Sequence, residues 1–294
     1  MNYPAYKKHI HCLLCEKTQL STVKMFSASF LVKCNSCGFV FTERIPSPEE
    51  LQKHYAGYLS ISQLSPVTAL RYNELLSEFE KFRNTSRILD VGCGNGLFLE
   101  VAKKRNWQVF GTEFTEENVM RCREKGITVF KGDITENNFE KESFDVVVSF
   151  EVLEHINNPV AYATSIRQLL RKGGMFYFTT PNFNALNKYL LGSKWNIVEY
   201  PEHLGYFTKR TAVKLFTSCG FEKEKIMTTG INLHRYQSSL QQHTLPQENH
   251  ETPDELLRKK IESRKLLKFA KSIINFFLDK TSLGDSLKGY FVRL

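Results

Sequence analysis

The feature that most constrains the fold is a short stretch in which an apolar run meets a cluster of glycines, at residues 87–98. Three apolar residues surround Asp90, and Gly92, Gly94 and Gly96 follow at every second position. An apolar run that ends at a glycine cluster predicts a strand followed by a tight turn. Apolar residues then recur at helical spacing, which predicts a helix after the turn. Together these elements predict a cradle in which the backbone can closely approach a nucleotide-like ligand.

The spacing of the glycines distinguishes this loop from a dinucleotide-binding loop. A dinucleotide fingerprint has the spacing Gly-x-Gly-x-x-Gly, whereas the third glycine here, Gly96, comes one position early. The acid that opens the loop, Asp90, would repel a pyrophosphate and suits a cationic ligand. The loop therefore predicts a nucleotide-type cofactor that carries a positive charge.

Length and composition limit the class of protein. A chain of 294 residues is one large domain or one domain with appendages. A hydrophobic content of 41% and a charged content of 24% are ordinary for a soluble globular protein. No apolar run approaches the roughly 20 residues of a membrane helix, and the N-terminus lacks the apolar core of a signal peptide. We therefore expect a cytoplasmic protein. Its net charge of +9 is compatible with nucleic acid, an anionic membrane surface, anionic substrates or a merely solvated surface.

Four of the seven cysteines form two pairs near the N-terminus, Cys12-x-x-Cys15 and Cys34-x-x-Cys37. Two such knuckles can present four thiolates in a tetrahedron, the geometry that Zn²⁺ accepts. The segment is too small to bury a core, so a bound metal would supply its stability. Four thiolates leave no open coordination position, which favours a structural zinc over a catalytic one. The alternative interpretation is four unrelated thiols.

From residue 87 onward, segments with strand and helix patterns alternate along the chain. Such alternation predicts a mostly parallel sheet covered by helices on both faces. Ligands of such sheets bind beyond the carboxyl ends of the strands. We expect strands at 87–91, 107–112, 127–130, 144–149, 174–180 and 222–231, and helices at 66–82, 96–105, 115–125, 159–171 and 208–219.

Acidic residues follow the second and third predicted strands. Glu113 can accept both ribose hydroxyls of an adenosine, although an acid at a helix N-terminus is the alternative interpretation. Asp133 can accept the adenine amino proton, and Ile134 can pack on the ring. The three strand ends together predict an adenosine-type site.

The fourth and fifth strands carry the most specific pattern. Residues 144–156 read Phe-Asp-Val-Val-Val-Ser-Phe-Glu-Val-Leu-Glu-His-Ile, and Leu170-Arg-Lys-Gly-Gly follows. Over residues 87–182 the chain resembles the core of class I S-adenosylmethionine-dependent methyltransferases. The resemblance implies such an enzyme activity and an α/β, Rossmann-like, seven-stranded sheet whose last strand, near 283–294, is antiparallel. It also implies S-adenosyl-L-methionine as cofactor, bound by Asp90, Gly92, Cys93, Gly94, Gly96, Glu113, Phe114, Asp133, Ile134 and Phe150.

The N-terminal cysteine pairs ahead of this core resemble the zinc-containing bacterial methyltransferases. Some members of that group methylate nucleotide-linked deoxysugars at carbon. The resemblance therefore implies a structural Zn²⁺ in a zinc-ribbon-like module and a small, anionic acceptor such as a nucleotide sugar.

Two regions supply candidate catalytic residues. A carbon or hydroxyl acceptor needs a general base, and Tyr200, Glu202 and His203 lie in the loop that covers the acceptor site in this fold. The carboxylate can orient the imidazole, which makes His203 the candidate base. The sugar C-methyltransferases carry a similar Tyr-x-Glu-His motif. His155, after the fourth strand, is a second candidate. The alternatives are a packing role for His203 and a substrate-contact or anchoring role for His155.

The C-terminal part has a different composition. A polar stretch at 237–253 predicts a loop, and residues 256–278 predict a basic amphipathic helical segment. Its apolar side can pack on the core, form a dimer contact or lie on a membrane surface. We favour packing on the core or a dimer contact over a membrane surface, since an amphipathic face also suits packing on the core.

These observations combine into one expected organisation. Methyl transfer to a small, anionic metabolite is the expected function. The alternatives are an RNA or protein methyltransferase that uses the zinc module and the basic helix, and a non-catalytic binding protein of the same fold. The zinc module has no basic stripe interleaved with aromatics, which counts against nucleic acid. The expected parts are a zinc-binding module (1–45), a linker and lead-in helix (46–85), the methyltransferase core (86–236), the polar loop with the basic helical segment (237–282) and the last strand (283–294).

Overall fold

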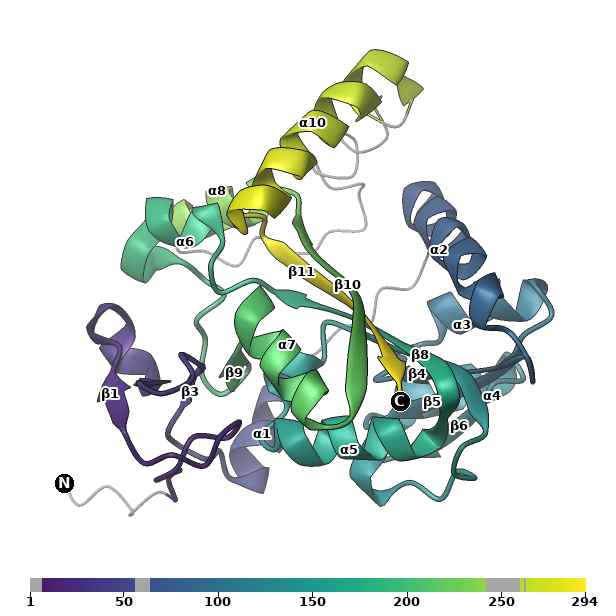
Figure 1. Ribbon diagram of the computed structural model, residues 1–294, viewed down its shortest axis with the longest axis horizontal. Coiled ribbons are helices and arrows are strands. Elements are labelled where there is room, and N and C mark those ends of the chain that lie inside the picture. The colour runs from purple at the N-terminus through teal and green to yellow at the C-terminus, as the bar shows by residue number, and fades with distance from the viewer. Residues whose placement is uncertain (1–6, 56–63, 242–259, 262) are drawn as a thin grey trace.

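The centre of the protein is a seven-stranded sheet of order β10-β11-β8-β7-β4-β5-β6 (Figure 1). The computed structural model describes residues 7–55, 64–241, 260–261 and 263–294. Strands β4 to β8 run parallel to one another, and β11 lies antiparallel between β8 and β10. The predicted α/β fold with an antiparallel last strand is confirmed. The strands are β4 (Arg87–Val91), β5 (Gln108–Glu113), β6 (Thr128–Lys131), β7 (Phe144–Phe150), β8 (Leu170–Pro181), β10 (Phe221–Thr229) and β11 (Ser286–Arg293).

Helices cover both faces of this sheet because alternate residues of each strand point in opposite directions. In β8, Phe176 and Phe178 pack with helices on one face, while Met175 and Tyr177 pack with helices on the other. The first face carries α5 (Pro159–Leu169) and α7 (Lys209–Ser218), and the second carries α2 (Pro66–Phe79), α3 (Leu97–Lys104) and α4 (Glu116–Glu124).

The predicted elements of the core agree with the structure to within a few residues, and the differences have local causes. Strand β8 begins at Leu170 rather than at 174, because Leu170 already pairs with Phe144 of β7. Helix α5 begins at Pro159, where the Asn158 side chain accepts a hydrogen bond from the backbone N–H of residue 161. The shorter elements around the sheet are α1 (Pro48–Tyr55), α6 (Leu186–Leu191), α8 (Leu233–Gln241), η1 (Lys24–Ser29), η2 (Glu80–Phe82), η3 (Ile134–Glu136), η4 (Leu153–His155) and η5 (Gly192–Lys194).

A second, four-stranded sheet joins the N-terminal module to the core. Its order is β1-β2-β3-β9, and β9 (Gly205–Tyr206) comes from the loop after β8. Val40 pairs with Tyr206, and the rings of Phe39 and Phe207 lie 4.8 Å apart. The loop that was predicted to cover the acceptor site therefore leads directly into an edge strand of the N-terminal module. The other strands are β1 (Leu20–Thr22), β2 (Leu31–Cys34) and β3 (Val40–Thr42).

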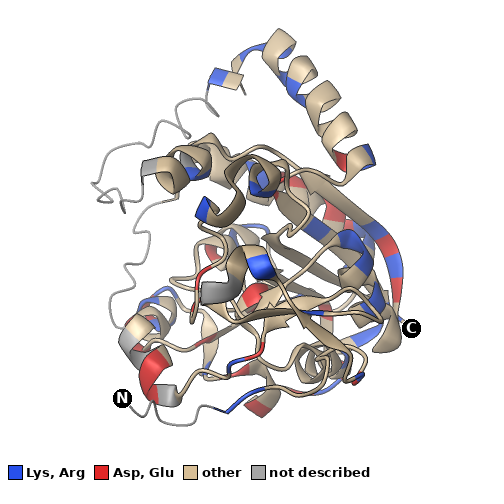
Figure 2. Ribbon diagram, turned by 90° about the vertical axis from the view of Figure 1, so that its left-hand side faces the viewer, with Lys and Arg blue, Asp and Glu red and all other residues tan. Residues whose placement is uncertain are grey.

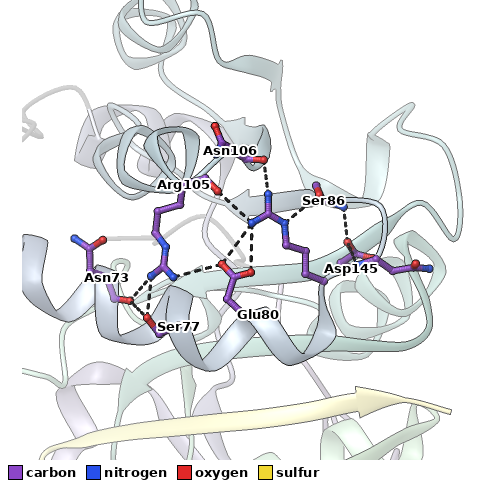
Figure 3. A network of polar contacts seen from close by, with 9 residues as sticks. Asn73, Ser77, Glu80, Ser86, Arg105, Asn106 and Asp145 are labelled. Atoms are coloured by element: carbon purple, nitrogen blue, oxygen red, sulfur yellow. Dashed lines mark hydrogen bonds and ion pairs between the residues drawn. The ribbon is translucent and has the colours of Figure 1, made fainter.

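A polar network attaches α2 to the end of α3 (Figure 3). The guanidinium of Arg83 donates to the carboxylate of Glu80 and to the backbone carbonyl of Arg105. Arg105 in turn donates to the carbonyl of Asn73, at 2.6 Å. Beside them, the buried carboxylate of Asp145 accepts the backbone N–H of Ser86 at 2.7 Å. The network joins the C-terminal half of α2 to the end of α3, which matters because α2 also carries Tyr72.

The C-terminal segment differs from its prediction. Residues 237–241, predicted as loop, belong to α8, and residues 242–259 and 262 lie outside the described part of the chain. Helix α10 (Lys265–Thr281) projects from the body beyond β10 and β11 (Figure 1). Its apolar side chains are exposed, so the predicted packing of this face on the core is wrong. None of the helices in the described ranges is long and apolar enough to cross a membrane.

Candidate cofactor and acceptor sites

The glycine loop leaves space for a ligand on one side and packs tightly on the other. At Gly94 the backbone has φ of +52°, and a side chain there would meet open space. At Gly96, with φ of +79°, a Cβ atom would lie 2.7 Å from Ile127 and 2.9 Å from the sulfur of Cys122. The N–H of Gly94 donates to Oε2 of Glu113 at 3.0 Å. The loop is thus pressed against the protein at Gly96 and open at Gly94.

Asp90 lies at the end of β4 with an unsatisfied oxygen. Its side chain is 3% exposed, and Oδ1 has no hydrogen-bond partner among the described residues. Burial raises the pKa of this carboxyl well above its ordinary value. Burial and the charge of Asp90 also raise the pKa of Tyr72 to about 12, and the Tyr72 ring packs on Phe98 and Phe150. A buried acceptor oxygen without a partner is rare and points to a donor or cation that binds there.

The acids predicted after the next two strands are held by backbone groups. The carboxylate of Glu113 accepts the backbone N–H and the hydroxyl of Thr115, both at 2.9 Å. The carboxylate of Asp133 accepts the N–H of Thr135 at 2.7 Å and caps η3. A carboxylate has about four acceptor positions, so both acids retain capacity for a ligand. Beside them Ile134 is buried and Phe114 is 64% exposed.

Cys93 belongs to the glycine loop, but its thiol points inward. Its sulfur lies 4.0 Å from that of Cys122, and a Cβ atom on Gly111 would lie 2.6 Å from it. The contact with Cys122 and burial raise the pKa of the Cys93 thiol well above its ordinary value. The side chain therefore packs beneath the loop as a small, neutral group.

Three side chains meet where β7 and β8 end: Glu154, His155 and His203. One nitrogen or carboxylate oxygen of each lies within 4.8 Å of the others. Nδ1 of His155 lies 2.7 Å from the carbonyl oxygen of Glu202, and Nδ1 of His203 lies 2.6 Å from that of Ile197. Because a carbonyl oxygen only accepts hydrogen bonds, each Nδ1 carries the ring proton. Each histidine therefore has an unprotonated Nε2 atom that can accept a proton or bind a metal ion.

Burial shifts the pKa of each member of this cluster toward its neutral form. Burial, together with the neighbouring His155, lowers the pKa of His203 to about 4. Burial also lowers the pKa of His155. Burial and the charge of Glu151 raise the pKa of Glu154 well above its ordinary value, and Glu154 accepts the hydroxyl of Thr180 at 2.7 Å.

The predicted relay from Tyr200 and Glu202 to His203 differs from the observed contacts. Nδ1 of His203 donates to the backbone carbonyl of Ile197, because the chain turns back on itself before the histidine. The carboxylate of Glu202 lies 3.9 Å from Nε2 of His54. The hydroxyl of Tyr200 lies 3.4 Å from Glu50, a residue of α1. Glu202 and Tyr200 therefore connect the acceptor loop to the N-terminal part of the chain.

The four cysteines of the N-terminal module converge as predicted. The sulfurs of Cys12 and Cys37 lie 3.5 Å apart, and those of Cys15 and Cys34 lie 3.6 Å apart. All four lie within 4.8 Å of one another. A tetrahedral Zn²⁺ with bonds of about 2.3 Å separates its sulfur ligands by about 3.8 Å. The cluster therefore fits a zinc ion. In the described part of the chain, the cluster at Glu154 is the second group close enough to share an ion.

A comparison with known protein families matches the core of the chain but not the cysteine module. The family model described as a methyltransferase domain matches residues 66–226, more than half of the chain. The chain belongs to this methyltransferase family. The matched span begins at α2 and ends within β10, so the paired cysteines, α10 and β11 lie outside it.

Two curated relatives of this chain are named as O-methyltransferases. A ubiquinone biosynthesis O-methyltransferase of Cereibacter sphaeroides is 32% identical over 117 residues, which cover 37% of this chain and 47% of the relative. A protein of the same description from Roseobacter denitrificans is 31% identical over 137 residues, 45% of this chain and 55% of the relative. The chain thus spans about half the length of the curated relatives it matches. Because these relatives are not sugar C-methyltransferases, the nucleotide-sugar acceptor stays a prediction.

Solved structures share the fold at low sequence identity. A methyltransferase from Archaeoglobus fulgidus superimposes with a TM-score of 0.53 and 17% identity, over 83% of this chain and 98% of that chain. The geranyl diphosphate C-methyltransferase of Streptomyces coelicolor, determined with S-adenosyl-L-homocysteine, gives a TM-score of 0.53 and 14% identity over 77% of this chain and 79% of that chain. These similarities support the methyltransferase fold of the core.

The residues of the methyltransferase core fit S-adenosylmethionine. A sulfonium cofactor brings a positive charge, an amino group, ribose hydroxyls and an adenine. The free oxygen of buried Asp90, the open side of the loop at Gly94 and the remaining acceptor positions of Glu113 and Asp133 match these groups. Ile134 and Phe114 add apolar surface. These hydrogen-bond acceptors and apolar side chains therefore agree with the cofactor of the family.

Some residues of the site were not predicted. Tyr72 comes from the helix before the first core strand, and nothing in the local pattern links it to Asp90. Glu154 was part of the quoted motif, but it lies beside His203 because the chain returns to it near Leu204, whose backbone N–H donates to the carbonyl of Glu154 at 2.7 Å. His54 is placed near Glu202 by α1. A contact between distant segments, rather than a motif, brings each of these residues to the site.

Proposed function

We propose that this protein transfers the methyl group of S-adenosylmethionine to a hydroxyl group of a small molecule. The observation that supports the proposal is that two sites lie at the carboxyl ends of neighbouring strands of the sheet. The free carboxylate oxygen of Asp90 lies at the end of β4, and the unprotonated Nε2 atoms of His155 and His203 lie beyond β7 and β8. The adjacent strands β4 and β7 bring a donor site and an acceptor site together.

The cofactor contributes an activated methyl group and its own leaving group. Asp90 would face its positively charged part, Glu113 its ribose hydroxyls and Asp133 its adenine amino group. Gly92, Gly94 and Gly96 would let the backbone approach it, with Cys93 packed below, while Ile134, Phe114 and Phe150 would cover its apolar parts. The chain's task is then to orient the acceptor and to receive its proton.

We assign the proton transfer to His203, with His155 as its partner. Nε2 of His203 is free to accept because the Ile197 carbonyl holds the proton on Nδ1. A hydroxyl becomes a good nucleophile only as its proton leaves, so a neutral imidazole beside it lowers the barrier. Glu202 and Tyr200 act as positioning residues: they join the acceptor loop to His54 and Glu50.

Two acceptor classes have support. The net positive charge of the chain and the paired cysteines favour an anionic metabolite such as a nucleotide sugar. Arg235, on α8, is near enough for its charge to act on Glu154 and His203, which suits an anionic acceptor. The named relatives favour a hydroxyl of a ubiquinone-biosynthesis intermediate. We rank the anionic metabolite first because Arg235 belongs to this chain.

We also propose that Cys12, Cys15, Cys34 and Cys37 hold a structural Zn²⁺. The sulfur separations support it, and so does the small size of the module. Through β9, such an ion would stabilise the acceptor loop rather than take part in the reaction.

The test is a methyl-transfer screen with the purified protein, S-adenosylmethionine, nucleotide sugars and ubiquinone-type phenols, with RNA as the counter-substrate. His203→Asn is the informative variant, because its amide nitrogen can keep the contact with the Ile197 carbonyl while Nε2 is lost. We expect turnover to fall by about 10²- to 10⁴-fold, with unchanged affinity for S-adenosylhomocysteine. Full turnover by this variant would remove His203 from the proton transfer. Transfer to RNA alone would refute the small-molecule acceptor.

A further inference from the structure

Helix α10 presents its apolar side to the solvent. Each large apolar side chain on this side is between 43% and 78% exposed, whereas Leu278 is buried against the body. At 100° per residue, the exposed side chains lie on one side of the helix, and Leu278 lies on the other. We call this side the outward face of α10; it consists of Leu266, Phe269, Ile273, Ile274, Phe276 and Phe277.

The orientation of the outward face is fixed, because hydrogen bonds hold the C-terminal end of α10 to the body. The carboxylate of Asp279 accepts the Lys209 ammonium and the N–H of Thr228, at 2.6 and 2.8 Å. The hydroxyl of Thr228 donates to the carbonyl of Leu278 at 2.9 Å. These contacts hold the polar side of the helix against β10, so the apolar side must point away. Exposed apolar patches of this kind mark binding surfaces.

The charge of α10 distinguishes between the partners that could cover this face. The helix carries Lys265, Lys268, Lys271 and Lys280 and a single acid, Asp279, which is paired with Lys209. Most of these lysines lie beside or behind the outward face, so they would surround an apolar contact rather than lie within it. An anionic surface would be attracted by these lysines (Figure 2). Bulky apolar side chains with lysines along the helix are the composition of helices that lie in the membrane interface.

The length and position of α10 agree with an interfacial role. Its 17 residues span about 25 Å, shorter than the roughly 30 Å of a bilayer core. The helix leads into β11, where Ser286 pairs with Pro181, the last residue of β8. It therefore leaves the body at the same edge of the sheet as Asp90 and the His155–His203 pair. A surface bound by α10 would lie on the side of the molecule where an acceptor enters.

We propose that the outward face of α10 binds an anionic lipid surface, with the apolar side chains in the interface and the lysines at the lipid headgroups. This binding is independent of the proposed reaction. It lies outside the span of the chain that matches the methyltransferase family.

The experiment is flotation of the full chain with vesicles of phosphatidylcholine alone or of phosphatidylcholine with about one third phosphatidylglycerol. We expect binding to the anionic vesicles and at least tenfold weaker binding to the neutral ones, with a loss at high salt. Phe269→Glu with Phe276→Glu should weaken binding by at least about tenfold, since burying each ring contributes more than about 1.4 kcal/mol. Leu190→Glu is the matched control: Leu190 is 62% exposed, but it lies on α6.

Two results would overturn the proposal. One is equal binding by the double variant and the wild-type chain. The other is a wild-type dimer in light scattering that the double variant converts to a monomer, without binding of either to vesicles; the face would then join two copies of the chain. Binding of S-adenosylhomocysteine by the double variant, measured by calorimetry, would show that the variant is folded. Its absence in the wild-type chain would count against the proposed cofactor site and not against lipid binding.

Discussion

The proposed cofactor side and the proposed acceptor side of this protein are built in different ways. On the cofactor side, Asp90 and Glu113 lie at the ends of β4 and β5 and Asp133 follows β6, and backbone groups hold Glu113 and Asp133. On the acceptor side, Glu154 and His155 follow β7, whereas His203 lies in a loop that completes the sheet of the N-terminal module. The first site depends on local chain geometry, and the second depends on contacts between distant segments.

This difference has a functional consequence. Loss of the N-terminal module should damage the acceptor side and leave the cofactor side intact, because β9 pairs with β3 while β4 pairs with β5 and β7. Conversely, a change at the strand ends should weaken cofactor binding without altering the acceptor loop. The two sides can therefore be separated by substitution.

The largest effect is expected at the cysteine cluster. Cys34→Ser removes one ligand of a site whose zinc contributes on the order of 10 kcal/mol to folding. We expect zinc content to fall from about one per chain to near zero, and methyl transfer to be lost. Affinity for S-adenosylhomocysteine should stay within about threefold, as measured by calorimetry. Cys219→Ser, at a half-buried cysteine outside the cluster, is the control. Parallel loss of cofactor affinity would show that the two sides are not separable.

A smaller effect is expected at Glu113. Glu113→Gln keeps the size of the side chain but weakens its hydrogen bond to a ribose hydroxyl, and one such bond to a charged group contributes up to about 3 kcal/mol. The Kd for S-adenosylhomocysteine should rise by about 100-fold, with zinc content unchanged. The matched control is Glu117→Gln, because Glu117 is an exposed acid on the following helix. An unaltered Kd would exclude the ribose role of Glu113.

The smallest effect is a pH dependence of stability on the acceptor side. His203 has a pKa lowered to about 4 from an ordinary value of 6.5, so the unfolded chain binds a proton that the folded chain rejects. The stability contributed by neutral His203 is complete above pH 6.5 and is lost as the pH falls toward 4. Between pH 7.5 and pH 5 the loss is about 2 kcal/mol.

The test compares the wild-type chain with His203→Asn by urea unfolding at both values of pH. The stability advantage of the wild type should shrink by about 2 kcal/mol at pH 5. An advantage that is the same at both values would mean that His203 titrates normally, and the buried acceptor cluster would have to be reconsidered.

The same division explains how much the sequence could predict. The core strands, the helices between them and the cysteine cluster were predicted within a few residues, because periodicity and short motifs are local signals. Strand β4, for example, has the predicted bounds of 87–91. The candidate residues of the cofactor side lie together for the same reason.

The rest depends on long-range contacts that leave no local signal. Strand β9 has only two residues, Gly205 and Tyr206, too few for a pattern, yet it connects the two parts of the molecule. The observed partner of His203 is the carbonyl of Ile197, not the predicted carboxylate of Glu202. For α10, periodicity predicted an amphipathic helix, but it could not predict that the apolar side would face outward.

We propose that the carboxyl ends of the strands, from Asp90 to Asp133, bind a sulfonium cofactor or its product. The most direct measurement is a calorimetric titration of the zinc-loaded chain with S-adenosylhomocysteine. We predict one binding site per chain with a Kd that rises on Glu113→Gln and is unaffected by His203→Asn. Absence of binding by the folded, zinc-loaded chain would contradict the claim.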